Sequence, residues 1–298
     1  MTWVNDVLQG IFLGGAYALT AVGLSLMFGV MRMVNLAHGD LAVCGTYLAT
    51  TVMAAFGVPL WIAMLIMVPL AFLLGVVLQL SLFGRALRSG TTAPLLVTFG
   101  LSVIIENLLL QTYSANTRGV PAGNLDVAAV HLGSLVLPWL ALLKLVLALV
   151  VIGGLSVLLR YTAWGRRVRA TSDDVAVARL QGIRVRPLFA SVTGIAIAAA
   201  ALAGTLNAVT TGVYPTLGAL TLIFAFEAVI IGGLGSLWGT LVGGMLLGIT
   251  QVVVSQISVP YAILASQLLF LAVLALRPQG LFGTPQAAQA PQAPEGAG

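Results

Sequence analysis

Charged residues are concentrated in one segment of this chain and nearly absent from the long stretches on either side. Of its 13 basic and 8 acidic residues, nine fall within residues 160–186. A charged side chain costs roughly 3 kcal/mol at the centre of a bilayer, so this segment must lie in water between apolar spans. With 60% hydrophobic and 7% charged residues, the 298-residue chain has too little polar surface to cover a soluble domain. The sequence therefore predicts an all-α, polytopic membrane protein.

The apolar segments define the expected spans. They run roughly over residues 7–30, 41–56, 60–83, 93–112, 138–159, 188–212, 220–234, 240–257 and 260–276. Several are shorter than the ~20 residues of a straight span. We predict eight or nine transmembrane helices, some of them broken or re-entrant, within one transmembrane domain, residues 1–283. The Ala-, Pro- and Gln-rich residues 284–298 are predicted to form a disordered cytoplasmic tail.

The arginines predict the orientation. Residues 160–186 hold seven arginines, whereas residues 114–137 hold only Arg118. Positive loops stay in the cytoplasm, so the first segment is expected inside and the second outside. Arg85, Arg88 and Arg277 place residues 84–92 and the C-terminus inside as well. The N-terminus, which carries Asp6 and no Lys or Arg, is expected outside. This bias explains the pI of about 9.9 without a nucleic-acid partner. The single Cys44 forms no intrachain disulfide, and no spacing predicts a metal site.

A short helix is predicted inside the basic segment, over residues 171–182. Thr171 or Ser172 can cap it, with Asp173 and Asp174 in its first turn. Arg179 suits its C-terminal end and Gly182 can terminate it. So short and polar a helix needs a docking surface. Either a peripheral partner protein or anionic lipid headgroups would supply one, and the sequence leaves both open.

Two other segments interrupt the apolar pattern. Residues 28–40 place Asn35, His38 and Asp40 between two apolar runs, and on a helix Asn35 and His38 would share a face. Residues 230–240 contain four glycines within eight residues, which makes a continuous helix improbable. Paired interruptions in a transporter indicate a substrate path. The alternative interpretation is two ordinary turns, with glycines for tight packing and polar residues as caps. The candidate path residues are Asn35, His38, Asp40, Gly232, Gly233, Gly235 and Ser236.

Two carboxylates, Glu106 and Glu227, lie near the middle of apolar runs. An ionisable group at that depth either lines a pathway or is protonated or hydrogen-bonded between helices. Lys144 lies near the end of its span and can extend to the membrane surface, so no role is assigned to it.

Several of these motifs resemble the permease subunits of branched-chain amino acid ABC importers. The resemblance is carried by Phe28-Gly-Val-Met-Arg-Met-Val-Asn-Leu-Ala-His-Gly-Asp40 and by Ile231-Gly-Gly-Leu-Gly-Ser-Leu-Trp-Gly239. Supporting it are residues 165–183 and the ending Leu276-Arg-Pro-Gln-Gly-Leu-Phe-Gly283. The match covers nearly the whole chain up to the tail and is similar to the shorter of the two permeases of such systems.

The resemblance implies a bacterial inner-membrane importer. An external solute-binding protein would deliver a branched-chain or related small amino acid, an amide or urea to a pair of permeases. Two cytoplasmic ATPases would drive alternating access and would use the ATP, since this chain has no Gly-x-x-x-x-Gly-Lys-Ser/Thr sequence. The 171–182 helix becomes the candidate ATPase-coupling element. Its candidate residues are Arg169, Thr171, Asp173, Asp174, Arg179, Leu180 and Gly182.

Two other protein classes compete with this interpretation. An ion-coupled secondary transporter would use Glu106 or Glu227 as its ion site, but it leaves the ordered basic segment unexplained. An intramembrane hydrolase is disfavoured, because His38 and His131 are the only histidines and no Gly-x-Ser-x-Gly motif is present.

Overall fold

The protein is a bundle of long apolar helices, seen in a computed structural model that describes residues 2–90, 92–123, 128–132 and 135–283. The predicted tail, residues 284–298, lies outside the described residues. In chain order the elements are α1 (Thr2–Met31), α2 (His38–Phe56), α3 (Leu60–Leu78), the π-helical η1 (Gln79–Phe83), α4 (Gly84–Ala86), α5 (Ala93–Tyr113), β1 (Ala129–Leu132), β2 (Leu135–Pro138), α6 (Trp139–Tyr161), α7 (Ala163–Asp173), α8 (Val175–Leu180), α9 (Val185–Thr211), α10 (Leu217–Gly232), α11 (Leu237–Ser255) and α12 (Val259–Leu276).

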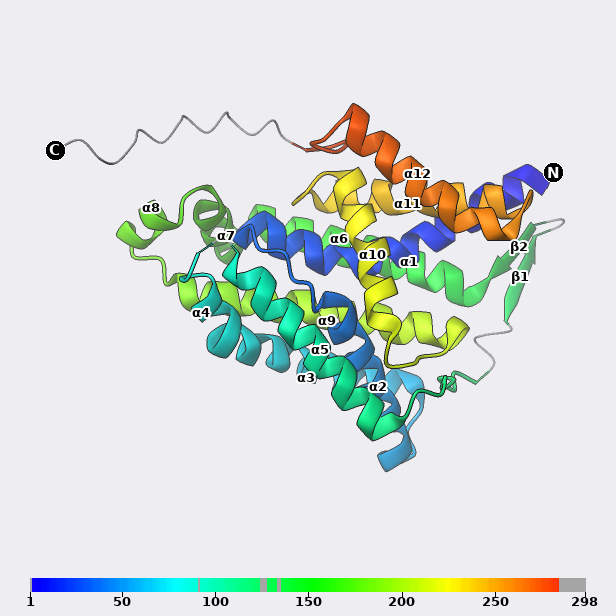
Figure 1. Ribbon diagram of the computed structural model, residues 1–298, viewed down its shortest axis with the longest axis horizontal. Coiled ribbons are helices and arrows are strands. Elements are labelled where there is room, and N and C mark those ends of the chain that lie inside the picture. Colours follow the sequence, from blue (N-terminus) through cyan, green and yellow to red (C-terminus); the bar gives the residue numbers. More distant parts are fainter. Residues whose placement is uncertain (1, 91, 124–127, 133–134, 284–298) are drawn as a thin grey trace.

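The predicted number of spans is confirmed. Among the described residues, eight helical stretches are long and apolar enough to cross a membrane, and one of them runs without a break through α3, η1 and α4. The apolar α10 is shorter, at 16 residues, and lies steeply inclined to its neighbours (Figure 1). A two-stranded antiparallel hairpin, which the sequence did not predict, pairs β1 with β2 before α6.

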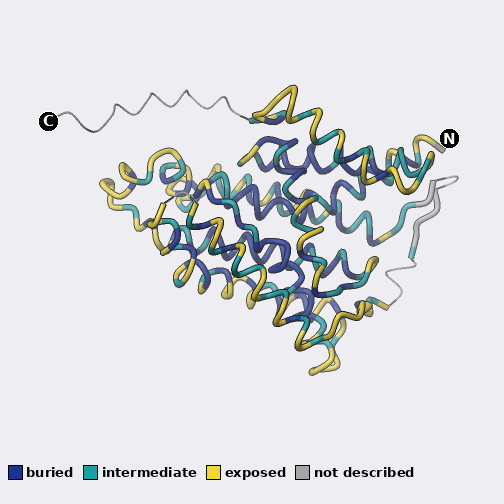
Figure 2. Tube along the Cα trace, viewed as in Figure 1, coloured by how far each residue is buried: buried dark blue, intermediate teal, exposed yellow. Residues whose placement is uncertain are grey.

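Helices α1 and α9 form the buried centre of the bundle (Figure 2). Close approach of α1 and α11 depends on two Gly-x-x-x-Gly pairs, one in each helix. A Cβ atom added at Gly10 or Gly14 of α1 would overlap the backbone of α11, and one at Gly248 of α11 would overlap that of α1. Without a hydrophobic drive between helices in lipid, such small residues permit the contact that holds helices together.

The outer helices expose apolar side chains. Leu65 of α3 is 75% exposed and Leu96 of α5 is 71% exposed. On a soluble protein such surfaces would be unfavourable, but they suit lipid tails or a neighbouring membrane subunit.

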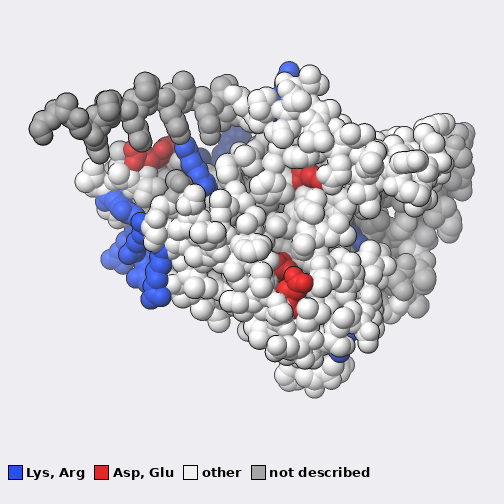
Figure 3. Space-filling view, viewed as in Figure 1, with Lys and Arg blue, Asp and Glu red and all other residues white. Residues whose placement is uncertain are grey.

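The loops alternate between two ends of the bundle as the arginine pattern predicts. Arg88 shares a hollow with Arg179 and Arg184, so residues 84–90 and the basic segment lie at the same end. Arg118 lies at the opposite end, beside Gly57 and Pro59. We call the first the Arg-rich end, and Figure 3 shows its basic side chains gathered at the left of the molecule.

Candidate functional site

The first interrupted segment turns back into the bundle after α1. Arg32 adopts a left-handed backbone conformation (φ 49°), and the chain then returns through buried residues to the start of α2. His38, the first residue of α2, lies beside Thr20, near the middle of α1. Helix α2 therefore begins deep in the bundle rather than at its surface.

Asn35 and His38 support this turn from within. Asn35 lies before the helix, so the two residues do not share a helical face. The Asn35 side-chain oxygen accepts a hydrogen bond from the Ala37 N–H at 3.1 Å, and its backbone oxygen accepts one from the His38 N–H at 3.2 Å. The His38 Nε2 lies 2.9 Å from the Thr20 carbonyl oxygen, which can only accept, so Nε2 carries the proton. Both side chains are fully buried.

The first turns of α2 and α10 meet at this depth. A Cβ atom added at Gly39 would overlap the Gly218 carbonyl, and one added at Gly218 would overlap the Asp40 carboxylate. The residues that precede the two helices, Ala37 and Thr216, cap neither of them with a side chain, although the Asp40 carboxylate accepts a hydrogen bond from its own backbone N–H in the first turn of α2. Two helix N-termini, with their partial positive charge, therefore lie side by side within the bundle.

One face of α5 presents polar groups to this junction. The Ser102 hydroxyl donates a hydrogen bond to the Asp40 carboxylate at 2.5 Å, and the Thr98 hydroxyl accepts one from the Leu36 N–H at 3.2 Å. Glu106 follows Ser102 by one turn, is half-buried, and lies within electrostatic range of Asp40. We call Asp40, Ser102 and Glu106, with the starts of α2 and α10, the helix-start site.

Glu227 lies elsewhere. It follows Gly218 by about 13 Å along α10 and is buried, with only 3% of its surface exposed. Gln267 donates a hydrogen bond to it, while its Oε2 atom has no partner among the described residues. In Figure 3 two acidic patches lie apart from each other in the middle of the face shown, away from the basic side chains at the left. The structure therefore brings Glu106 to the Asp40 region and leaves Glu227 apart.

A polar network surrounds the region of Glu227. The Tyr17 hydroxyl donates to the Gln251 side-chain oxygen at 2.6 Å, and the Gln251 amide donates to the Ser266 hydroxyl at 3.0 Å. The Tyr17 ring stacks on Phe224, with 4.9 Å between the ring centres. These contacts join α1, α10, α11 and α12.

The second interrupted segment is a turn at the Arg-rich end. Gly233 and Gly235 adopt positive φ angles of 103° and 85°, which glycine permits. The Ser236 hydroxyl then caps α11 by accepting from the Gly239 N–H at 3.1 Å. Gly29, near the end of α1, packs directly on Gly235. The two interrupted segments thus touch where α1 ends.

The C-terminal residues complete this turn. The Leu281 and Phe282 N–H groups donate to the carbonyls of Ile231 and Gly232, at 2.9 and 3.0 Å. Those carbonyls belong to the last turn of α10 and have no partner within the helix. A pocket of about 590 Å³ lies here, and its lining includes Arg32, Asp173 and Ser236. The sequence contained the C-terminal motif but no signal of its pairing partner.

The basic segment folds as two helices instead of one, and the predicted cap was wrong. Thr171 and Ser172 lie in the last turn of α7, where the Thr171 hydroxyl is buried and donates to the Arg167 carbonyl at 2.8 Å. The cap of α8 is Asp174, whose carboxylate accepts from Ala176 N–H at 2.7 Å and Val177 N–H at 3.1 Å. Asp173 is the last residue of α7.

The end of α8 agrees with the prediction. Arg179 lies in its last turn, and Gly182 adopts a positive φ of 79° just beyond it. Leu180 projects outward with 88% of its surface exposed. Arg169 donates to the carbonyl of Leu159 and so joins α7 to the end of α6. An exposed, capped helix with an apolar tip thus stands at the Arg-rich end (Figure 1).

The fold and these sites define a polytopic membrane permease, with broken helices meeting inside the bundle and a structured basic element at one end. The chain belongs to the family described as the branched-chain amino acid transport system permease component, whose model matches residues 7–276.

Named relatives are similar along nearly the whole chain. The high-affinity branched-chain amino acid transport system permease protein BraD of Pseudomonas aeruginosa is 29% identical, over 95% of this chain and 97% of its own. The corresponding LivH of Escherichia coli is 27% identical, over 95% and 96%. The fructose import permease FrcC of Rhizobium meliloti is 36% identical over only 30% of this chain and 27% of its own. No solved structure matches.

Proposed function

We propose that this chain is the membrane-spanning permease of an ABC importer for branched-chain or related small amino acids. It works with a second permease subunit, an external solute-binding protein and two separate ATPase subunits that use the ATP. The observation that carries the proposal is the similarity, over 95% of the chain, to permeases named for branched-chain amino acid transport. The chain itself performs no catalysis.

The helix-start site is the proposed point of substrate passage. A small amino acid carries one carboxylate and one ammonium group. The N-termini of α2 and α10 favour the carboxylate, and the carboxylates of Asp40 and Glu106 favour the ammonium group. Asn35 and His38 fix the start of α2 through hydrogen bonds to the backbone of Ala37 and Thr20. The turn Gly232–Ser236, which includes Gly233 and Gly235, links the path to the Arg-rich end.

Helix α8 is the proposed coupling element. Its exposed Leu180 and its Arg179 are available to a peripheral subunit, while Asp174 keeps the helix formed. This role places the Arg-rich end in the cytoplasm and the Arg118 loop outside. The protein would then lie in the bacterial inner membrane, with its N-terminus outside and its C-terminus inside.

An ion-coupled secondary transporter is the second candidate. The buried Glu227, with one carboxylate oxygen unpartnered among the described residues, is the observation that favours it. Such a carrier would transport without ATPase subunits and would depend on Glu227.

Purification from native membranes in mild detergent, followed by transport in liposomes, separates the two candidates. We expect an ATPase and a second permease to copurify, and to be lost together in the Arg179→Glu variant. Uptake should require a solute-binding protein, and it should require ATP on the side of the membrane where the ATPase subunits lie. A lone chain that transports with an ion gradient and no ATP, and that stops in Glu227→Gln, would refute the importer proposal.

A further inference from the structure

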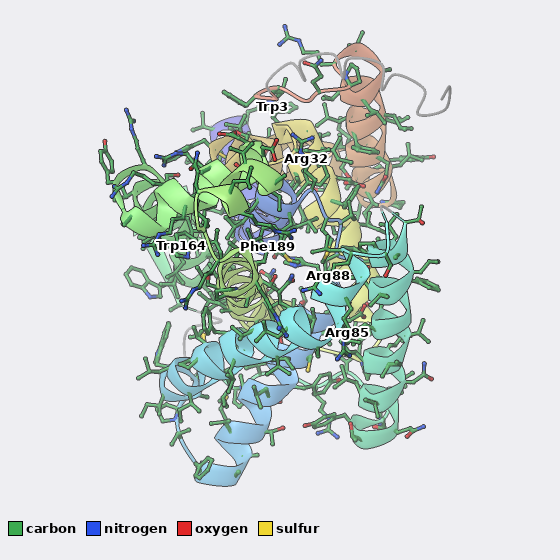
Figure 4. The ribbon with its side chains drawn as sticks, turned by 90° about the vertical axis from the view of Figure 1, so that its left-hand side faces the viewer. Trp3, Arg32, Arg85, Arg88, Trp164 and Phe189 are labelled. Carbon is green, nitrogen blue, oxygen red and sulfur yellow. The ribbon has the colours of Figure 1, made fainter. Side chains whose placement is uncertain are left out.

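Four arginines surround one hollow at the Arg-rich end. The hollow has a volume of about 600 Å³, and its lining residues come from the turn after α4, from α8 and from the start of α9. They are Arg88, Arg179, Arg184, Val185, Arg186 and Pro187. Figure 4 faces this end and shows Arg88 beside the start of α9, near Phe189.

No carboxylate balances this charge. None lines the hollow, and among the described residues none of the four arginines forms an ion pair or a side-chain hydrogen bond. Guanidinium groups that converge without an opposite charge repel one another, and their planar donors match phosphate oxygens in pairs. The arrangement therefore fits an anion with several oxygen atoms.

The position of the hollow indicates where that anion comes from. Arg88 lies two residues beyond the span that ends at Ala86, and Arg184 immediately precedes the span that begins at Val185. The end of a span is the level of the lipid headgroups. Two spans thus bring their arginines to the height at which a lipid phosphate lies.

The span that leads to the hollow carries exposed apolar side chains. On this span, which ends at Ala86, Val77 is 52% exposed and Leu82 is 40% exposed. Beside the arginines, the lining also contains Val185 and Pro187. A free anion would gain nothing from these side chains, whereas a phospholipid places its acyl chains along such a surface.

We propose that this hollow binds the phosphate group of an anionic phospholipid. The bound headgroup joins the turn after α4 to the end of α8 and the start of α9, so it fixes the position of the proposed coupling helix. The site is independent of the transported substrate, and its failure would leave the proposed function standing.

The test measures phospholipid binding to the full-length chain, with its copurifying subunits, in nanodiscs. The nanodiscs contain phosphatidylcholine with increasing phosphatidylglycerol, and retained lipid is counted by native mass spectrometry. The test variant removes three lining arginines and spares Arg179: Arg88→Gln, Arg184→Gln and Arg186→Gln. The control removes the same charge from the same end, outside the lining: Arg160→Gln, Arg166→Gln and Arg277→Gln.

We expect the test variant to bind phosphatidylglycerol about 100-fold more weakly, from roughly a fivefold loss for each arginine removed, and the control to stay near wild type. Replacement of the same three arginines by lysine, which keeps the charge, should restore most of the binding. This lysine variant also separates loss of charge from misfolding.

Three results would overturn the proposal. Equal weakening of phosphatidylglycerol binding in the test and control variants would mean that the lipid is attracted by diffuse surface charge and not by the hollow. Inorganic phosphate is also added at millimolar concentration to pure phosphatidylcholine nanodiscs. If it protects the chain against thermal unfolding as strongly as phosphatidylglycerol does, the hollow is a site for a free anion. Unchanged lipid binding together with loss of the copurified ATPase would mean that an acidic protein surface occupies the hollow.

Discussion

Asp174→Ala should loosen α8 without unfolding the bundle. The Asp174 carboxylate accepts two backbone hydrogen bonds, at 2.7 and 3.1 Å, in the first turn of a helix of six residues. Replacement of such a cap by alanine costs about 1 kcal/mol. A helix this short has no stability of its own in water, so the loss falls directly on its folded fraction.

The expected size of the effect follows from this free energy. A loss of about 1 kcal/mol changes the ratio of formed to unformed helix roughly fivefold. Hydrogen exchange of the α8 amide groups should therefore become about fivefold faster, while exchange in the buried centre of α9 stays unchanged. If α8 couples the permease to an ATPase, ATP-dependent uptake should fall with the same variant.

Three matched variants test the reasoning. Asp173→Ala should be neutral or slightly stabilising, because Asp173 lies at the negative end of the α7 dipole. Ser172→Ala should also be neutral, since Ser172 caps neither helix. Asp174→Asn should keep most of the protection, because asparagine caps as well as aspartate. Equal exchange rates in Asp174→Ala and Asp173→Ala would refute the assignment of the cap.

Three further changes probe the helix-start site and the closing turn, by which we mean the turn after α10 that Leu281 and Phe282 complete. Ser102→Ala removes the hydroxyl that donates to Asp40, so it should lower the free energy of unfolding by about 1–3 kcal/mol and slow initial uptake. Ser102→Thr keeps a hydroxyl and should restore uptake, so equal uptake in the two variants would contradict this role. Gly218→Ala places a Cβ against Asp40 and should destabilise by about 1–3 kcal/mol, seen as a lower thermal midpoint in detergent. Its control, Gly153→Ala, has open space around the added atom and should be neutral or stabilising. Equal thermal midpoints in the two variants would contradict the close contact between Gly218 and Asp40. Leu281→Pro removes the N–H that donates to the Ile231 carbonyl, so amide hydrogen exchange at the end of α10 should become faster. Unchanged exchange would show that this hydrogen bond does not hold the turn.

Local signals predicted the features that depend on local sequence. The apolar runs gave the spans because each helix satisfies its own backbone in lipid. Gly182 was correctly assigned as a terminator, since a residue in the left-handed conformation at a helix end requires little beyond its own backbone freedom. The positions of the two basic loops at one end followed from the alternation of spans.

Tertiary contacts decided what the sequence did not determine. Thr171, Ser172 and Asp174 are all good capping residues, but the first two belong to α7, where Thr171 is buried, so Asp174 is left as the cap of α8. Ser102 gave no signal as a partner of Asp40, because the pairing depends on the return of the chain after α1. Glu106 and Glu227 look equivalent in the sequence. The packing of α5 and α10 gives them different surroundings, and the sequence does not show that packing.

The turn after α10 depends on residues that lie far along the chain. The carbonyls of Ile231 and Gly232 receive their hydrogen bonds from residues that are synthesised only after α11 and α12. A chain interrupted before Leu281 would carry every membrane helix yet leave these two acceptors bare at the end of α10. The turn can therefore form only after α11 and α12 have been synthesised and the chain has passed beyond them.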